Sequence, residues 1–399
     1  MRFTFACCFY SHDPMIKGTF PVDRFQTLDT PFYYYDMELL RATLDTIKRE
    51  TENRPFLIHY ALKANANPHL LKLIASYGFG ADCVSGNEIR TALACGFTPD
   101  KILFAGVGKT DKDILTGLEH EISCFNVESL PELEVMNCLA GTVNKKARVA
   151  LRVNPNVDAR THRYITTGLD ENKFGINEQD IPEALSMVTD SPYLELVGLH
   201  FHIGSQITDL SSFEDLCVKA REWQKRLHKQ GTKLPVINVG GGLGINYHHP
   251  NHFPMADFEA YFRLFERHLI PLPGQSLFFE LGRSIVAPSG SLITRALYVK
   301  DGIQKNFLIV DAGMTDLVRP ALYGAYHHIE NLTSNDEMEP YDVVGPICES
   351  SDMFAKQRLL NRAKRGDLIA IRSAGAYGET MASTYNGREL PTSYFSDQL

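Results

Sequence analysis

The feature that most constrains this chain is an eightfold alternation of short apolar runs with amphipathic segments, between about residues 30 and 285. The runs are HYALKA (59–64), GADCVS (80–85), ILFAGV (102–107), SCFNVE (123–128), VALRVN (149–154), GLHFHI (198–203), INVGGG (237–242) and FFELG (278–282). Strands that alternate eight times with helices are typical of a closed (β/α)8 TIM-type barrel in the α/β class. Because the pattern does not show closure, a doubly wound open sheet is the alternative.

After about residue 285 the pattern changes to strand-like runs joined by turns. These runs are SLITRALYVKDG (291–302), KNFLIVDAG (305–313), YDVVGPICES (341–350) and GDLIAIRSAGAY (366–377). They predict a C-terminal, mostly antiparallel β domain, Greek-key or β-barrel-like, that also takes in the N-terminal segment. We expect the barrel to span residues 30–283, the β domain to combine 15–29 with 284–399, and residues 1–14 to form a flexible extension.

Composition and charge exclude several classes of function. The formal net charge is −8 and no long basic run occurs, so a nucleic-acid partner is not expected. No stretch is apolar and long enough to span a membrane. The eight cysteines form no C-x-x-C pair, which indicates reduced thiols and a cytoplasmic protein. The start, MRFTFACCFYSHDP, lacks the features of a signal peptide, so secretion is not expected.

Polar residues gather where the predicted strands end. Active sites of (β/α)8 enzymes lie at the carboxyl ends of the strands. The residues found there are Lys63, Asp82, Ser85, Glu128, Arg152, Asn154, His202, Gly240, Gly241, Gly242, Glu280 and Arg283. A barrel that served as a scaffold alone would not need so dense a polar set, and we therefore expect an active site at this end.

Lys63 ends an apolar run and is followed at once by the turn NANP. Burial of an ammonium group is costly, so one interpretation is a rim lysine whose charged end reaches water. The other is that Lys63 acts as an amine toward an aldehyde, with its pKa lowered by desolvation at the barrel mouth.

Three further groups favour the second interpretation. The run GGGLGI (240–245) lets backbone N–H groups approach an anion such as a phosphate, although a tight turn would also explain it. Glu280 needs a cationic partner, either Arg283 or a protonated ring nitrogen. His202 is either a hydrogen-bonded core group or a flat face for a ring. An aldehyde, a phosphate and a basic ring nitrogen together describe pyridoxal 5′-phosphate (PLP).

Seven segments then carry a specific resemblance, in order along the chain. They are YALKAN, HFHIGSQ, NVGGGLGI, FELGRS, RPALY, GPICESSD and AGAY. With them the chain, from about residue 17 onward, resembles the barrel-fold, PLP-dependent amino-acid decarboxylases of fold type III. Within that family it most resembles the members that convert meso-2,6-diaminopimelate to L-lysine and CO₂, the last step of lysine biosynthesis. Two departures, Leu281 in place of a Pro and Ser351 in place of a Gly, leave the expected side-chain contacts intact.

The resemblance implies a role for each candidate residue. Lys63 would form the Schiff base with PLP, His202 would stack on its ring, and Glu280 would face the ring nitrogen. Cys348 would be the proton donor, supplied by the second subunit of a homodimer with a shared active site. The implied cofactor contacts are Lys63, Asp82, Ser85, Arg152, His202, Ser205, Gly240, Gly241, Gly242, Glu280, Leu281, Gly282, Arg283 and Tyr377, supported by Glu88. The implied substrate contacts are Arg283, Arg319, Tyr323, Glu349 and Tyr377, and the β domain would also form the dimer interface.

Substrate choice is argued from charge. Diaminopimelate carries two ammonium and two carboxylate groups, so its far end needs both a cation and an anion. Arg319 can bind a carboxylate with two hydrogen bonds and Glu349 can pair with an ammonium, although Arg319 would also suit an ordinary ion pair. Another basic or D-amino acid, a carboxy-polyamine, amino-acid racemisation and a PLP carrier without activity remain open. The histidines of YHHPNH (247–252) and AYHH (325–328) fit no zinc spacing, and we expect surface loops and no metal.

Overall fold

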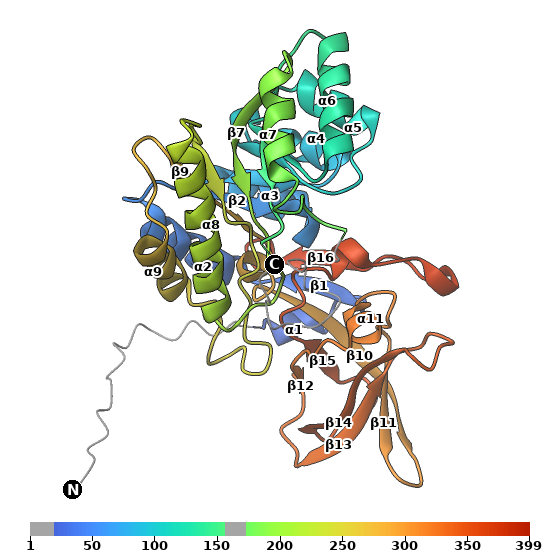
Figure 1. Cartoon of the computed structure of the whole chain (residues 1–399). Helices are drawn as coiled ribbons and strands as arrows, with labels where there is room; N and C mark the ends of the chain where they lie inside the picture. Colours follow the sequence, from blue (N-terminus) through green and yellow to red (C-terminus); the bar gives the residue numbers. More distant parts are fainter. Residues whose placement is uncertain (1–19, 156–172) are drawn as a thin grey trace, which may run out of the picture.

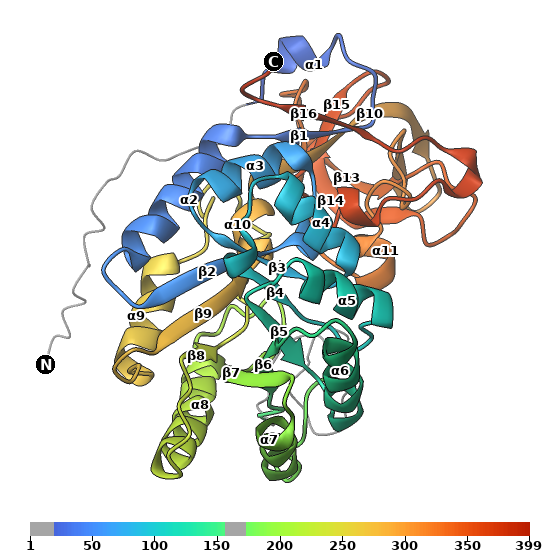
Figure 2. The ribbon, with the colours of Figure 1, turned by 90° about the horizontal axis from the view of Figure 1, so that it is seen from above.

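The computed structural model describes residues 20–155 and 173–399. Eight parallel strands form a closed ring: β2 (Phe56–Ala61), β3 (Gly80–Cys83), β4 (Ile102–Phe104), β5 (Cys124–Val127), β6 (Ala147–Arg152), β7 (Leu194–His200), β8 (Val236–Asn238) and β9 (Ser276–Leu281). Each strand pairs with the next in chain order, and β9 pairs with β2 (Figures 1 and 2). The predicted (β/α)8 barrel is confirmed, and the β2–β9 pairing excludes the open sheet.

Helices cover the outside of this ring. They are α2 (Met37–Thr51), α3 (Pro68–Ser76), α4 (Gly86–Ala94), α5 (Asp111–Glu119), α6 (Leu130–Thr142), α7 (Ile181–Asp190), α8 (Ser211–Lys229) and α9 (Phe258–His268). Several begin at side chains that accept a hydrogen bond from the first turn: Asp36 for α2, Asn67 for α3 and Ser85 for α4. Such caps satisfy backbone N–H groups that the helix leaves unpaired, so they fix where each helix starts relative to the strand before it.

The inside of the ring has an apolar layer and a polar layer. Leu103, Cys124, Ala150, Val197 and Phe278 form a small buried cluster of their own. Residues two positions apart on a strand share a face, so the next inward residues on β5, β6, β8 and β9 are polar. These are Asn126, Arg152, Asn238 and Glu280, and all are buried. The apolar layer therefore supports a polar layer at the carboxyl ends of the strands.

The rest of the chain forms a second sheet. Its strands are β1 (Phe32–Tyr35), β10 (Gly290–Asp301), β11 (Asn306–Val310), β12 (Ile329–Asn331), β13 (Met338–Val344), β14 (Met353–Asn361), β15 (Leu368–Ile371) and β16 (Thr392–Phe395). They run in the order β12-β15-β10-β11-β13-β14, with β1 beside β10 and β16. Two pairs are parallel, β1–β16 and β11–β13, and the other pairs are antiparallel. The predicted, mostly antiparallel β domain is confirmed.

Segments that lie far apart in the chain meet in this sheet, since β1 lies beside β16 (Figure 2). The short helix α1 (Val22–Phe25) places Phe25 against Phe32, Tyr34 and Ile293 in a separate apolar cluster. Strand β1 begins just after residue 30, where the barrel was expected to begin, and yet it pairs with β10 of the second sheet. The domain boundary at residue 30 stays a prediction. Residues 1–14 and 15–19 lie outside the described residues.

Two short helices lie at the mouth of the barrel, α10 (Arg283–Val286) directly after β9 and α11 (Arg319–Tyr323) in the β domain. Over residues 20–155 and 173–399, we find no helix with the length and apolar character needed to cross a membrane. The six cysteines within these ranges are unpaired, whereas Cys7 and Cys8 lie outside them.

Candidate active site

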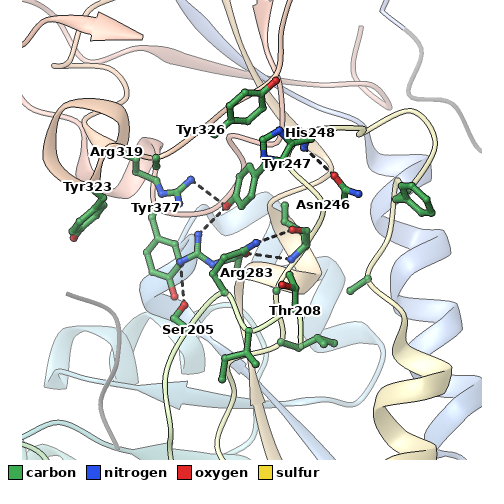
Figure 3. Close-up of a pocket in the computed structure, with 18 of the residues that line it drawn as sticks. Ser205, Thr208, Asn246, Tyr247, His248, Arg283, Arg319, Tyr323, Tyr326 and Tyr377 are labelled. Atoms are coloured by element: carbon green, nitrogen blue, oxygen red, sulfur yellow. Dashed lines mark hydrogen bonds between the residues drawn. The ribbon is translucent and has the colours of Figure 1, made fainter. Parts of the chain in front are cut away.

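A cavity of about 920 Å³ lies between the carboxyl ends of the barrel strands and the β domain (Figure 3). Its lining comes from the loops after β2, β7, β8 and β9 and from the segments around α11 and Tyr377. The predicted site residues in this lining are Lys63, His202, Ser205, Arg283, Arg319, Tyr323 and Tyr377. The fold thus brings together residues that are more than 300 positions apart in the chain, at the end of the barrel where the site was expected.

Lys63 lies in a single 3₁₀ turn, η1 (Leu62–Ala64), directly after β2. Its side chain is 40% exposed, and Nζ lies 3.7 Å from Oδ2 of Asp82. Both oxygens of the buried Asp82 carboxylate lack a hydrogen bond within the described residues. Burial works to lower the pKa of Lys63, but Asp82, Tyr377 and Glu280 raise it above the ordinary lysine value. The expected lowering is therefore wrong, because the acidic neighbours outweigh desolvation.

Glu280 is buried at the end of β9, in the polar layer of the barrel. Its Oε1 accepts hydrogen bonds from Nδ2 of Asn126 at 2.8 Å and of Asn238 at 2.7 Å, and His200 Nε2 lies 3.1 Å from Oε2. Burial raises the pKa of Glu280, but the interaction with His200 outweighs it and holds that pKa well below its ordinary value. A carboxylate kept ionised in this way suits a position beside a protonated ring nitrogen.

The glycines at 240–242 pack against the ends of neighbouring strands. A side chain at Gly241 would overlap the carbonyl oxygen of Glu280, and one at Gly240 would overlap that of Phe201. Gly240 also has a φ of +71°, which favours glycine. The N–H of Gly241 donates to Nδ1 of His202 at 3.3 Å. Packing and backbone conformation therefore account for the glycines, and a phosphate at this run stays a prediction.

His202 belongs to the cavity lining, as the resemblance implied. Burial and the charge of Arg152 hold the pKa of His202 well below its ordinary value, so its ring is neutral. A neutral, flat imidazole at the cavity wall fits the expected place beside a ring, although the stacking itself stays a prediction.

The remaining predicted cofactor contacts do not belong to the cavity lining that the described residues form. Ser85 Oγ accepts a hydrogen bond from the N–H of Glu88 at 3.2 Å and so caps α4. Arg152 Nη1 lies 2.7 Å from Oε1 of Glu128, and both side chains are buried. Two further residues at the end of β9 complete the set, Leu281 and Gly282. These residues position the strand ends, and their contacts with a cofactor stay predictions.

Two arginines converge on one hydroxyl group in the cavity. Arg283 donates from Nη1 to Oη of Tyr247 at 2.8 Å and from Nη2 to Oγ of Ser205 at 3.0 Å. Arg319 donates from Nη1 to the same Tyr247 Oη at 3.1 Å and lies 2.8 Å from Nε2 of His327. The alternative in which Arg283 is the cationic partner of Glu280 is therefore wrong. In the part of the chain described, neither guanidinium has a carboxylate within 4.0 Å, so the ordinary ion pair considered for Arg319 is also wrong.

Tyr247 and His327 were missed by sequence reasoning. Both belong to histidine-rich segments that were expected to form surface loops, yet both are buried. Tyr247 follows the glycine run on the loop between β8 and α9, and that position on the active-site face of a barrel was the available signal. His327 is buried by the packing of the β domain, which no local pattern reports. Among the described residues, no group of three His, Cys, Asp or Glu side chains is placed to hold a metal ion.

Tyr377 lies in the cavity of its own chain. Its N–H donates to the carbonyl oxygen of Ala64 at 2.8 Å, and its ring centroid lies 4.8 Å from the guanidinium carbon of Arg283. Tyr377 has a φ of +56°, a left-handed conformation that is uncommon outside glycine. This backbone turn places the β-domain residue against the segment that carries Lys63, and Tyr323 lines the same cavity from α11.

Cys348 and Glu349 lie elsewhere. Both are exposed on the β domain, where the N–H of Cys348 donates to Oδ1 of Asn386 at 3.2 Å and Glu349 accepts from the hydroxyl of Tyr385 at 2.8 Å. Neither belongs to the cavity lining that residues 20–155 and 173–399 form. Within one chain, these two predicted site residues are therefore not brought to the others.

Comparison with known proteins places this geometry in a family. Residues 38–287 match the model of the pyridoxal-dependent decarboxylase, pyridoxal binding domain. A diaminopimelate decarboxylase of Bacteroides thetaiotaomicron is 57% identical over 96% of this chain and all of its own length. That of Aquifex aeolicus is 41% identical over 94% of this chain and 88% of its own. A crystal structure of diaminopimelate decarboxylase from Helicobacter pylori complexed with L-lysine superposes with a TM-score of 0.88 at 43% identity, covering 94% and 93% of the two chains.

Proposed function

This chain belongs to the pyridoxal-dependent decarboxylases, in the group of diaminopimelate decarboxylases, and on that premise we propose that it converts meso-2,6-diaminopimelate to L-lysine and CO₂. One observation carries the proposal. Lys63 shares a cavity with two buried arginines, Arg283 and Arg319, that have no carboxylate partner among the described residues. An amine that is open to an aldehyde cofactor thus lies in the same cavity as a site suited to a substrate carboxylate.

The residues present fit PLP. Lys63 offers an amine that is exposed in the cavity, Glu280 an ionised carboxylate and His202 a neutral ring, while Asp82 keeps two buried oxygens that accept no hydrogen bond in the described chain. Bound PLP supplies a sink for the electron pair that remains on the substrate carbon when CO₂ departs. Glu280 would favour the protonated form of the ring nitrogen by charge pairing, and Lys63 would hold the aldehyde carbon until a substrate amine takes its place.

The substrate is oriented by its retained end. Arg283 and Arg319 bind the carboxylate that is not removed, with Tyr323 and Tyr377 beside it in the lining. Because both arginines are buried, their hydrogen bonds to a carboxylate are little screened by water. A diamine precursor without the second carboxylate leaves this cationic pair without a partner, which disfavours ornithine as substrate.

We further propose that the enzyme is a homodimer in which Cys348 and Glu349 complete the active site of the partner subunit. Their exposure on the β domain, away from the cavity of their own chain, supports this arrangement. The Cys348 thiol would donate a proton to the substrate carbon that has lost CO₂, and Glu349 would pair with an ammonium group. We also keep the proposal of a cytoplasmic location, which the unpaired state of the six described cysteines supports.

The test is turnover of meso-2,6-diaminopimelate by the PLP-loaded enzyme. We expect CO₂ and L-lysine in equal amounts. Racemisation, the competing activity, would change the optical rotation of an amino acid without release of CO₂. A PLP carrier would bind the cofactor and turn over no amino acid. Either of these two results would overturn the proposal.

A further inference from the structure

Tyr247 occupies an unusual place in the cavity, between two cations (Figure 3). Its hydroxyl oxygen accepts a hydrogen bond from Nη1 of Arg283 at 2.8 Å and another from Nη1 of Arg319 at 3.1 Å. The two arginines come from different parts of the chain, one from α10 at the end of the barrel and the other from α11 in the β domain. The hydroxyl oxygen of Tyr247 therefore contacts one positively charged side chain from the barrel and one from the β domain.

The repulsion between Arg283 and Arg319 would make this arrangement costly in free energy if no hydrogen-bond acceptor lay between the two side chains. Arg283 is 8% and Arg319 is 6% exposed, and like charges repel more strongly as water is excluded. Burial lowers the pKa of Arg319, and the charge of Arg283 lowers it further, which reflects this repulsion. His327, the other partner of Arg319, is neutral because burial and Arg319 lower its pKa to about 3. The cluster thus carries two positive charges that its polar neighbours do not neutralise.

Packing holds the Tyr247 ring in place. The ring is buried and meets the His327 ring edge-on, with centroids 5.1 Å apart. Nδ1 of His327 lies 2.9 Å from the carbonyl oxygen of Arg372, which fixes the imidazole with Nε2 facing Arg319. The guanidinium of Arg319 also lies 5.1 Å from the Tyr247 ring centroid. The hydroxyl is therefore an acceptor at a defined position rather than the end of a mobile side chain.

We propose that Tyr247 is a positioning residue that holds Arg283 and Arg319 together as one dicationic clamp for the substrate carboxylate that is retained. A carboxylate side chain in its place would neutralise one of the two charges and compete with the substrate, whereas a phenol accepts both hydrogen bonds and leaves both charges available. The inference rests on the proposed function for the identity of the ligand. It adds a residue that acts through the arginines and does not touch the reacting carbon.

The test uses two ligands that differ by a carboxylate, measured on the PLP-loaded enzyme and its Tyr247→Phe variant. L-lysine carries the retained carboxylate and cadaverine lacks it. In Tyr247→Phe we expect the Kd of L-lysine, from titration calorimetry, to rise about tenfold, the size of one lost charge-assisted hydrogen bond. The Kd of cadaverine should stay unchanged. The KM for meso-2,6-diaminopimelate should rise by a similar factor, with kcat within about twofold because the reacting carbon is not contacted.

The matched control is Tyr341→Phe. Tyr341 is a buried tyrosine of β13 whose hydroxyl bonds to Glu339 within the β domain, so its loss should leave both Kd values unchanged. A rescue variant, Tyr247→His, keeps an acceptor nitrogen and should bind L-lysine more tightly than Tyr247→Phe does. It also serves as the test if the Phe variant does not fold.

Three results would overturn the clamp: equal weakening of both ligands, a fall in kcat at constant KM, or an unchanged Kd for L-lysine. The two binding outcomes are independent of the proposed function. If the wild-type enzyme releases no CO₂ from diaminopimelate, that function fails, whereas the comparison of L-lysine with cadaverine still decides whether Tyr247 supports a carboxylate site.

Discussion

Glu280 is held as a carboxylate by three hydrogen-bonding neighbours at the centre of the barrel, and no arginine takes part. Two amide groups and one imidazole satisfy its oxygens, and the charge of Lys63 also lowers its pKa, so the negative charge is retained in a buried site. A protonated ring nitrogen of the cofactor is the cation that such a carboxylate favours. At this scale, the role that we propose for the residue is to keep one proton on another group.

Replacing Glu280 by Gln keeps its size and removes its charge. We expect the single-turnover rate of CO₂ release to fall about a hundredfold, which is typical for loss of one electrostatic group in a buried site. The absorbance of bound PLP should persist. The control is Glu134→Gln, an exposed residue of α6, which should leave the rate unchanged. A Glu280→Gln rate equal to that of the wild type would contradict the role.

His327 gives a prediction for pH. Its folded-state pKa is lowered to about 3, so as the pH falls below the ordinary histidine value the unfolded chain takes up a proton that the folded chain refuses. Stability therefore falls with falling pH, by up to about 2 kcal/mol of unfolding free energy between pH 6.5 and pH 5. Denaturant unfolding at pH 7 and pH 5 should show a smaller loss for His327→Gln than for the wild type.

Burial lowers the pKa of His59 to about 4, so His59 also lowers the stability as the pH falls, but it does so equally in the wild type and in His327→Gln. The difference between the two pH slopes therefore isolates His327. Equal slopes for the wild type and His327→Gln would mean that the histidine is charged in the folded protein or is not buried as described.

At the scale of elements, the end of β8 shows why glycine is needed beside the site. The backbone of Gly241 passes so close to Glu280 that no side chain fits between them. Gly241→Ala should displace the end of β9, lower the free energy of unfolding by about 1–3 kcal/mol, as overpacking does, and weaken PLP binding. Gly108, in the loop after β4, has open space around it, so Gly108→Ala is the matched control and should change neither quantity much. Unaltered stability of Gly241→Ala would contradict the packing.

The strands could be predicted, and some of their partners could not. Apolar runs and the helices between them identify all eight barrel strands, because a parallel strand buried on both faces has a distinctive local sequence. The parallel pairing of β1 with β16 joins segments about 360 residues apart, which no local pattern reports. The burial of Tyr247 and His327 escaped prediction for the same reason, since it depends on how the β domain covers the barrel mouth.

Some features of the candidate site could likewise be predicted from the sequence, and others could not. Residues at strand ends, such as Lys63 and Glu280, could be placed from the barrel pattern, because every parallel strand delivers its last residues to one face. The pKa of Lys63 could not be predicted, since its direction depends on the distance to Asp82 and on the total charge in the polar layer. Cys348 was predicted from resemblance alone, and the part that we propose for it in the chemistry requires a second chain.

At the scale of the whole molecule, the barrel supplies the amine of Lys63 and the β domain supplies half of the arginine pair. If Cys348 acts in the partner's site, Lys63→Ala and Cys348→Ala chains should complement each other when mixed. Half of the dimers would be mixed at equal amounts, and each would hold one intact site, so about a quarter of wild-type activity should return for a twofold-symmetric dimer. Absence of activity, with subunit exchange proven by differently tagged chains, would place the whole site within one chain.

The most direct test of the account compares kcat/KM for CO₂ release from four amino acids: meso-2,6-diaminopimelate, L-lysine, L-ornithine and L-arginine. The paired Arg283 and Arg319 predict that diaminopimelate exceeds each of the others by at least about a hundredfold, because a buried cationic site left without its carboxylate is costly. An enzyme that decarboxylates L-ornithine, L-arginine or L-lysine as well as diaminopimelate would contradict the central claim that these arginines select a substrate with a second carboxylate.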